Sequence, residues 1–173
     1  QFIKHKDKYM VHFKTLLSLM LFIPVFAFAE PVVDEATVRK IQAEMAETLE
    51  SGDTKAMLAI VEKYLYPGSK IIIDMSPNPN EGEIEIEYEK YMPMLKMSLD
   101  MMADADLHED ILGVTVDKTL NQATIEIKTI ANFKMMGMNI EDISVSETTY
   151  GVVDGEIKVL ISKDQVISSG PAE

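Results

Sequence analysis

The segment ETTYGVVDGEIK, residues 147–158, decides how this chain folds. Its first half carries the β-branched and aromatic residues of a strand, and the pair Asp154-Gly155 that follows is typical of a tight two-residue turn. The segment therefore predicts a β-hairpin whose two strands extend over residues 143–153 and 156–161.

The strand pattern continues toward the N-terminus. β-Branched or alternating segments predict four further strands, over residues 70–74, 83–87, 111–117 and 123–136. The first two flank the turn-rich segment SPNPN and form a short hairpin. Asn121 and Gly137 mark the turns that join the long strands.

Three helical patterns come before the long strands. Apolar side chains recur at three- and four-residue spacing over residues 34–50, 54–65 and 88–102. Gly52 ends the first helix, and either Asp53 or Thr54 caps the second. Three helices in the N-terminal half, then four long strands, indicate an α+β domain. We expect the helices to pack on one face of a cone-like, curved antiparallel sheet made of the four long strands and the short hairpin.

The composition limits the classes of partner and chemistry. The chain has 173 residues with 16 Lys+Arg and 29 Asp+Glu, which gives a formal net charge of −13. Such an acidic protein is a poor partner for nucleic acid, which is a polyanion. The sequence contains no Cys, so disulfides, thiol catalysis and iron–sulfur clusters are excluded.

The first 29 residues have the pattern of an export signal peptide. Lysines gather between residues 4 and 14, an uncharged run follows over residues 15–29, and Ala27-Phe28-Ala29 ends it with small residues. The run is shorter than the ~20 residues that a membrane-spanning helix needs. We expect cleavage after Ala29, no membrane anchor afterwards, and a periplasmic or extracellular location. An uncleaved anchor is the alternative.

The remaining chain is short enough for one domain. The signal peptide extends over residues 1–29, and Met10 is an alternative start for it. Residues 30–167 then form a single domain. We expect residues 168–173 to be a frayed tail.

The order of the predicted elements resembles the nuclear transport factor two-like superfamily, also called cystatin-like or ketosteroid-isomerase-like, to which polyketide-cyclase-like proteins also belong. The resemblance covers about residues 34–163. It is carried by ESGD at 50–53, YLY at 64–66 before KIIID at 70–74, and the segment 147–158. It implies a pocket between the inner sheet face and the helices, and a homodimer formed through the sheet. The superfamily includes enzymes, ligand-binding modules and interaction domains, so the fold leaves the function open.

The resemblance singles out Asp74 as a candidate catalytic base. Asp74 ends the strand after the second helix, where ketosteroid-isomerase-like members carry their general base, and a desolvated carboxylate suits proton transfer. The alternative is that Asp74 opens the turn at Ser76-Pro77. These isomerases also carry a tyrosine in the first helix as an oxyanion donor, but Met45 stands there in this sequence. A thioether donates no hydrogen bond, which counts against an enzyme.

The sequence alone does not decide which side of the strand around Glu147 faces the pocket. Glu147 shares one side with Ile143, Val145 and Thr149, and as an acid among apolar residues it could face the pocket as a second catalytic group. Alternatively, the opposite side faces inward. That side carries Ser144, Ser146, Thr148, Tyr150 and Val152.

Six side chains are candidates for the lining of a ligand pocket: Met45, Tyr64, Tyr66, Tyr91, Leu95 and Tyr150. Each tyrosine offers a ring and one hydroxyl, although a tyrosine that only fills the core has the same sequence pattern.

Methionine clusters raise the question of Cu(I), for which thioethers are soft ligands. One cluster comprises Met92, Met94, Met97, Met101 and Met102, and another comprises Met135, Met136 and Met138. No His or Cys accompanies either cluster, and methionine is a common filler of cores. We therefore predict no metal site and no cofactor.

These patterns together favour an exported domain that binds a small apolar or amphipathic molecule, or a protein partner, through an apolar pocket. The alternative is a proton-transfer enzyme of the isomerase, dehydratase or cyclase type, with Asp74 as base and Glu147 or Tyr150 as its partner. Cu(I) binding by methionines is a more distant alternative.

Overall fold

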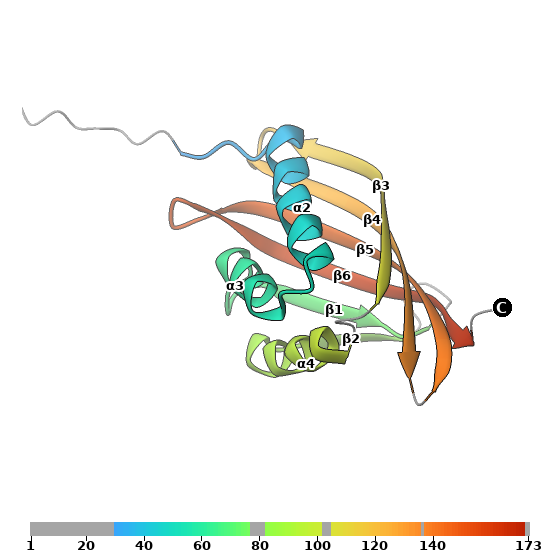
Figure 1. Ribbon diagram of the computed structural model, residues 1–173. Helices are drawn as coiled ribbons and strands as arrows, with labels where there is room; N and C mark the ends of the chain where they lie inside the picture. The colour runs from blue at the N-terminus through green and yellow to red at the C-terminus, as the bar shows by residue number, and fades with distance from the viewer. Residues whose placement is uncertain (1–29, 77–81, 102–104, 136, 172–173) are drawn as a thin grey trace, which may run out of the picture.

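A six-stranded sheet forms the frame of the protein (Figure 1). The computed structural model describes residues 30–76, 82–101, 105–135 and 137–171. The strands lie in the order β2-β1-β6-β5-β4-β3, and all neighbours are antiparallel except β1 and β6. Their bounds are β1 Lys70–Asp74, β2 Glu83–Ile86, β3 Asp106–Asp117, β4 Gln122–Met135, β5 Met138–Val153 and β6 Glu156–Pro171.

The turns between the long strands use left-handed backbone, as their sequences predict. Asp154 and Gly155 have φ angles of 52° and 79°, and they join β5 to β6. Asn121, with φ 51°, stands in the turn between β3 and β4. Asn, Asp and Gly tolerate this region better than other residues, so these positions set the hairpin register.

Three helices precede or interrupt the strands: α2 Glu35–Glu50, α3 Thr54–Tyr64 and α4 Tyr88–Met101. Aspartates cap the first two. The side chain of Asp34 accepts a hydrogen bond from the Thr37 amide at 2.8 Å, and that of Asp53 accepts one from the Ala56 amide at 2.9 Å. Each cap satisfies an amide that the helix leaves without a partner.

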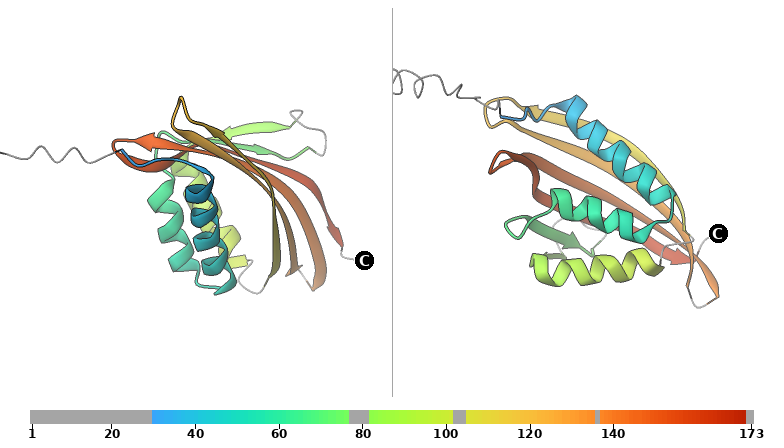
Figure 2. Two further views of the ribbon diagram at one scale, coloured as in Figure 1. Left: turned by 90° about the horizontal axis from the view of Figure 1, so that it is seen from above. Right: turned by 60° about the vertical axis from the view of Figure 1, so that its left-hand side comes forward.

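The helices lie on the concave side of the sheet, which curves around them (Figure 2). The fold is therefore α+β, with three helices on one face of an open, mostly antiparallel sheet, as the sequence predicts. Within the described residues, none of the helices has both the length and the apolar character needed to cross a membrane.

Strand register divides the sheet into two faces. On β4 the odd-numbered residues Ile125 and Ile127 are buried under the helices, and Ile125 lies opposite Thr148 of β5. The even-numbered residues of β5 therefore face the helices, because side chains alternate along a strand. This settles the alternative left open by the sequence, with Ser144, Ser146 and Tyr150 facing inward.

Two segments are more ordered into strands than the sequence predicts. Residues 106–110, which follow α4 and are rich in acids, form the start of β3. Residues 168–171 pair with β5, with Ser168 opposite Ile143 and Pro171 opposite Ile140, so the frayed tail predicted there is wrong for these residues. Both segments belong to outer stretches of the sheet, where polar side chains reach water and the apolar pattern is weak.

The first described residues are attached to the sheet by one side chain. The Asn121 amide donates to the Pro31 carbonyl at 2.9 Å and accepts from the Val33 amide at 2.9 Å. Val33 is buried beside them, at 2% exposure. The segment ahead of α2 is therefore held against the β3–β4 turn.

Candidate ligand-binding site

The concave face has two halves of different chemistry. In the apolar half, which adjoins the β5–β6 turn, the inward side chains are all buried: Ile71, Ala123, Ile125, Tyr150 and Val159. In the polar half, toward the other end of the sheet, five inward side chains carry hydroxyls or carboxyls and are only partly buried: Thr129, Asp142, Ser144, Ser146 and Asp164. They lie beside inward apolar side chains, of which Ile127, Ala131 and Ile140 are buried. A closed core seldom keeps five such polar groups, which makes the polar half the candidate for a binding site.

Asp164 is the central acid of the polar half. The register places it on β6 between Ile73 of β1 and Ser146 of β5. Desolvation, and to a lesser extent the charge of Asp142, raises the pKa of Asp164 from 3.8 to about 6. Its side chain keeps some accessible surface although protein surrounds it, which is what a group lining an enclosed space shows. Among the described residues, it has no hydrogen-bond or ion-pair partner.

Tyr91 of α4 is partly buried and packs against the core. Desolvation raises the pKa of the Tyr91 hydroxyl, and the negative charge of Asp164 raises it further. The hydroxyl is therefore protonated at all physiological pH values and can donate a hydrogen bond. Met92, the next residue on α4, packs against the core and sets the position of this helix.

Of the lysines on the described long strands, Lys158 of β6 reaches the helices, where it donates a hydrogen bond to the Lys63 carbonyl of α3 at 2.7 Å. Lys128 and Lys134 of β4 stand at even positions, opposite Val145 and Asn139, and therefore face outward. Lys163 of β6 also faces outward, where it forms an ion pair with Glu83. The acids of the polar half have no lysine on their own side of these strands.

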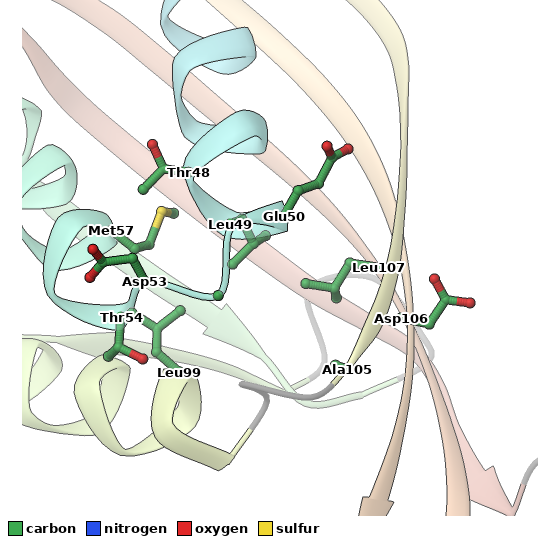
Figure 3. A pocket seen from close by; sticks show the side chains of 11 residues that line it. Thr48, Leu49, Glu50, Asp53, Thr54, Met57, Leu99, Ala105, Asp106 and Leu107 are labelled. Carbon is green, nitrogen blue, oxygen red and sulfur yellow. The ribbon is translucent and has the colours of Figure 1, made fainter.

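A cavity opens between the helices and β3 (Figure 3). It has a volume of about 290 Å³ and lies among the end of α2, the start of α3, the end of α4 and the start of β3. Leu107 points into it toward Leu49, whereas Asp106 points to the other side of β3. Leu107 and Asp142 both lie opposite Ala131, on its two sides, so the opening adjoins the polar half.

A second cavity of about 250 Å³ continues along α2 and β3 and shares Leu49, Glu50 and Leu107 with the first. Gln42 of α2 donates a hydrogen bond to Glu109 of β3 at 2.8 Å across it. Desolvation raises the pKa of Glu109, the hydrogen bond from Gln42 lowers it, and the charge of Glu50 raises it again. The entrance is therefore acidic like the interior.

Asp74, the predicted catalytic base, lies outside this site. It shares its side of β1 with Lys70, while Ile71 on the other side enters the core. Its side chain is fully buried, and its Oδ1 accepts hydrogen bonds from the Ser76 amide at 3.0 Å and the Gly82 amide at 3.1 Å. These contacts fit the turn-forming alternative.

Glu147, the second predicted catalytic group, also lies on the outer face. It is exposed and pairs in register with Glu126 of β4 and Lys163 of β6. Its distance from the helices follows from the same alternation that turns Ser146 inward.

The predicted pocket residues divide between core and site. Tyr64 and Tyr150 are buried and pack edge to face with ring centroids 6.4 Å apart, and Met45 packs against the same core. Tyr66 lies in the loop before β1, against Gly68. Tyr91 packs against the same core from α4, and Leu95, one turn later on α4, is partly buried.

Asp164 was missed in the sequence because the predicted strand ended at Ile161. The alternation continues past that point, with Ser162, Asp164 and Val166 on one side. Extending the strand over SKDQV would have placed an acid among inward positions.

The methionine clusters do not form a common site in the described residues. Met92 is partly buried against the core, whereas Met94, Met97 and Met138 are exposed. Met102, Met136 and the side chains of Met101 and Met135 lie outside the described residues. In the described part of the chain there is also no group of three or more His, Cys, Asp or Glu side chains suited to hold a metal ion.

Comparisons with known proteins identify the fold. No family model matches the chain, and no curated protein matches its sequence. Among solved structures, LinA superposes with a TM-score of 0.58 at 14% identity, covering 79% of this chain and 90% of LinA. A putative scytalone dehydratase from Novosphingobium aromaticivorans gives 0.54 at 11% identity, covering 79% of this chain and 85% of that one.

A further match is a protein of the same bacterium described as NTF2-like with a cystatin-like fold. It has a TM-score of 0.52 at 11% identity, and the match covers 78% of this chain and 82% of that chain. These identities are low, so the likeness concerns the fold and not the chemistry. The chain has the nuclear transport factor two-like, cystatin-like fold.

Proposed function

We propose that this protein binds a small amphipathic molecule in the polar half of the concave face. The observation that carries the proposal is the row of partly buried hydroxyl and carboxyl side chains beneath the helices, where a closed domain would have apolar residues. The ligand would enter between α2 and β3, where the two cavities meet.

The arrangement of the walls supports a ligand with one apolar and one polar part. Leu49, Leu99 and Leu107 line the entrance. On α4, Leu95 lies one turn after Tyr91 on the same side of the helix, and Met92 is the residue next to Tyr91 in the chain. Asp164 and Ser146 offer polar groups deeper inside. Solved proteins of this fold include a hexachlorocyclohexane dehydrochlorinase, whose name gives a small apolar substrate.

The test compares two substitutions on neighbouring positions of one strand. Ser146→Leu places a larger apolar side chain on the concave face, whereas Val145→Leu adds one methylene on the outer face. Native mass spectrometry of the purified protein identifies a co-purifying molecule, and its retention is then compared between the variants. We expect Ser146→Leu to lose the molecule and Val145→Leu to keep it. Equal retention by both folded variants would contradict the proposal.

A second candidate is proton transfer, and one observation favours it. Asp164 has its pKa raised to about 6, and a tyrosine hydroxyl lies near it. A carboxyl of this kind can take up and return a proton near neutral pH. If the co-purifying molecule is turned over, Asp164→Asn should reduce the rate at least a hundredfold and leave binding intact. A variant of undiminished rate would exclude Asp164 as the base.

We also propose that the protein is exported. The signal-like pattern ends at Ala29, and the chain attaches to the β3–β4 turn from Pro31 onward, so cleavage there would leave the domain entire. Cell fractionation with intact-mass measurement tests this. A periplasmic or secreted protein that begins at Glu30 supports the proposal, and an intracellular protein that retains residues 10–29 contradicts it.

A homodimer through the outer sheet face is a separate proposal, which rests on the superfamily resemblance. Glu126 and Glu147 stand side by side on that face, next to Lys163. Light scattering after size exclusion would show a dimer, and Glu147→Lys should weaken it. A monomer at all concentrations would contradict it.

A further inference from the structure

We propose that the free edge of β3 binds an extended segment of another protein, one that carries lysines or arginines along one side. This inference goes beyond the small-molecule site, because it concerns the backbone and side chains at the rim of the sheet. It follows from the position of β3 in the sheet, from the second cavity and from the charges beside that cavity.

β3 has a neighbouring strand on one side only within the described part of the chain. The sheet order ends at β3, and β4 is the strand that pairs with it. None of the other described segments forms a backbone hydrogen bond with its second edge. Alternate N–H and C=O groups of β3 therefore point to that edge, where water or an added strand can satisfy them.

The second cavity, of about 250 Å³, follows this edge. Leu107 and Glu109 line it from the concave side of β3, where they stand opposite Ala131 and Thr129. His108, between them in the chain, also lines it but belongs to the outer side of the strand. Because side chains from both faces of one strand line the cavity, it lies along the edge between those faces.

The opposite wall of the cavity is α2, which leaves room there for an added strand. Ala43 and Ala46 line this wall, and their side chains end at Cβ. Leu49 continues the wall, and Ile111 of β3, which also lines the cavity, is 38% exposed. Apolar side chains on one side of an added strand would fill this space, and its alternate side chains would turn outward.

The charges beside the edge specify those outward side chains. Asp106 and Asp110 stand on the outer side of β3 and are exposed. Lysine and proline, which commonly protect a sheet edge from pairing, are absent from β3. A strand with basic side chains at the matching positions is therefore attracted, and one with acidic side chains is repelled.

The same charges argue against a second copy of this chain as the occupant. The chain has a formal net charge of −13, so two copies repel each other. Antiparallel pairing of two β3 edges would also place Asp106 and Asp110 of both copies along one ladder, where like charges are destabilising. A basic segment of a different protein meets neither cost.

The test uses three acetylated and amidated peptides. KVKVKVK alternates lysine with valine, EVEVEVE reverses the charge, and KVKPKVK places at its centre a proline, which cannot donate to a ladder. Each is titrated at pH 7 and low salt into the isotopically labelled full-length protein, followed by NMR amide shifts and hydrogen exchange. We expect KVKVKVK to bind about tenfold more tightly than the other two and to slow exchange of alternate amides between residues 106 and 111.

Two double variants with the same change of charge make the test specific. Asp106→Lys combined with Asp110→Lys should reverse the preference, so that EVEVEVE binds about tenfold more tightly than KVKVKVK. Glu62→Lys combined with Glu89→Lys, at exposed positions of α3 and α4, should leave the preference unchanged. A gain of binding for the acidic peptide cannot arise from a loss of folding.

Four results would overturn the inference in distinguishable ways. If KVKVKVK shifts no amides of β3, the edge binds no basic strand. If KVKPKVK binds as tightly, or both double variants change the preference equally, the peptides respond only to the net charge of the protein. If the alternate β3 amides are protected without peptide, the edge is already occupied. The occupant is then a second copy where protection rises with protein concentration, and the chain itself where it does not.

Discussion

The two halves of the concave face share strands, curvature and a cover of helices, yet they differ in what they contribute. In the apolar half, Ile125 has no exposed surface and Tyr150 is 2% exposed, so these side chains hold the sheet to the helices. In the polar half, Asp164 of β6 and Ser146 of β5 remain partly exposed. If the proposed binding function holds, stability and ligand binding are separated along the strands of one sheet.

The comparison predicts opposite signs for mutations in the two halves. Ile125→Ala in the apolar half should lower the free energy of unfolding by about 3 to 4 kcal/mol, because it removes buried methyl groups and leaves a cavity. Urea denaturation at pH 7 measures this. A loss below about 1 kcal/mol would mean that the apolar half is not a packed core.

Asp164→Asn should instead stabilise the protein above pH 7. The folded state holds the pKa of Asp164 at about 6 against an ordinary value of 3.8. Folding therefore favours the protonated form, and the stability that this form provides is complete below pH 3.8 and is lost as the pH rises through about 6. At ~1.4 kcal/mol per pKa unit, the variant should gain up to about 3 kcal/mol at pH 8 and little near pH 4.

The control for this prediction is Asp110→Asn, which removes an equal charge from an exposed position. Its stability should follow that of the unmodified protein at both pH values. An Asp164→Asn variant that is destabilised at pH 8 would show that Asp164 has a stabilising partner.

The smallest effect is expected for Ser146→Ala. Ser146 faces accessible space and has no hydrogen bond with the described residues, so its loss should change the free energy of unfolding by less than about 0.5 kcal/mol. Thermal unfolding measures this against Ile127→Ala, one position across on β4 and 5% exposed. A large loss for Ser146→Ala would mean that the polar half is packed.

The fold follows from the sequence where local chemistry specifies it. Asp154-Gly155 adopts the left-handed backbone that its residue types favour, and Asp34 and Asp53 cap helices as short polar residues do. The side of β5 that faces the helices could not be predicted from the sequence, because both of its sides mix polar and apolar residues. Only the register with Ile125 and Ile127 of β4 decides it.

The site was harder to predict than the fold for a related reason. Asp74 matched a family position, but its location on the outer side of β1 depends on the alternation that starts from Ile71. Asp164 lies in a strand segment with few apolar residues, which resembles a loop when read alone. A site made of polar side chains weakens the very pattern from which its strand would be recognised.

The measurement that tests the central claim most directly is the titration of the Asp164 side-chain carboxyl by ¹³C NMR. An enclosed carboxyl without a counterion should titrate near pH 6. Titration near the ordinary value of 3.8 would contradict the enclosure of Asp164 on the concave face.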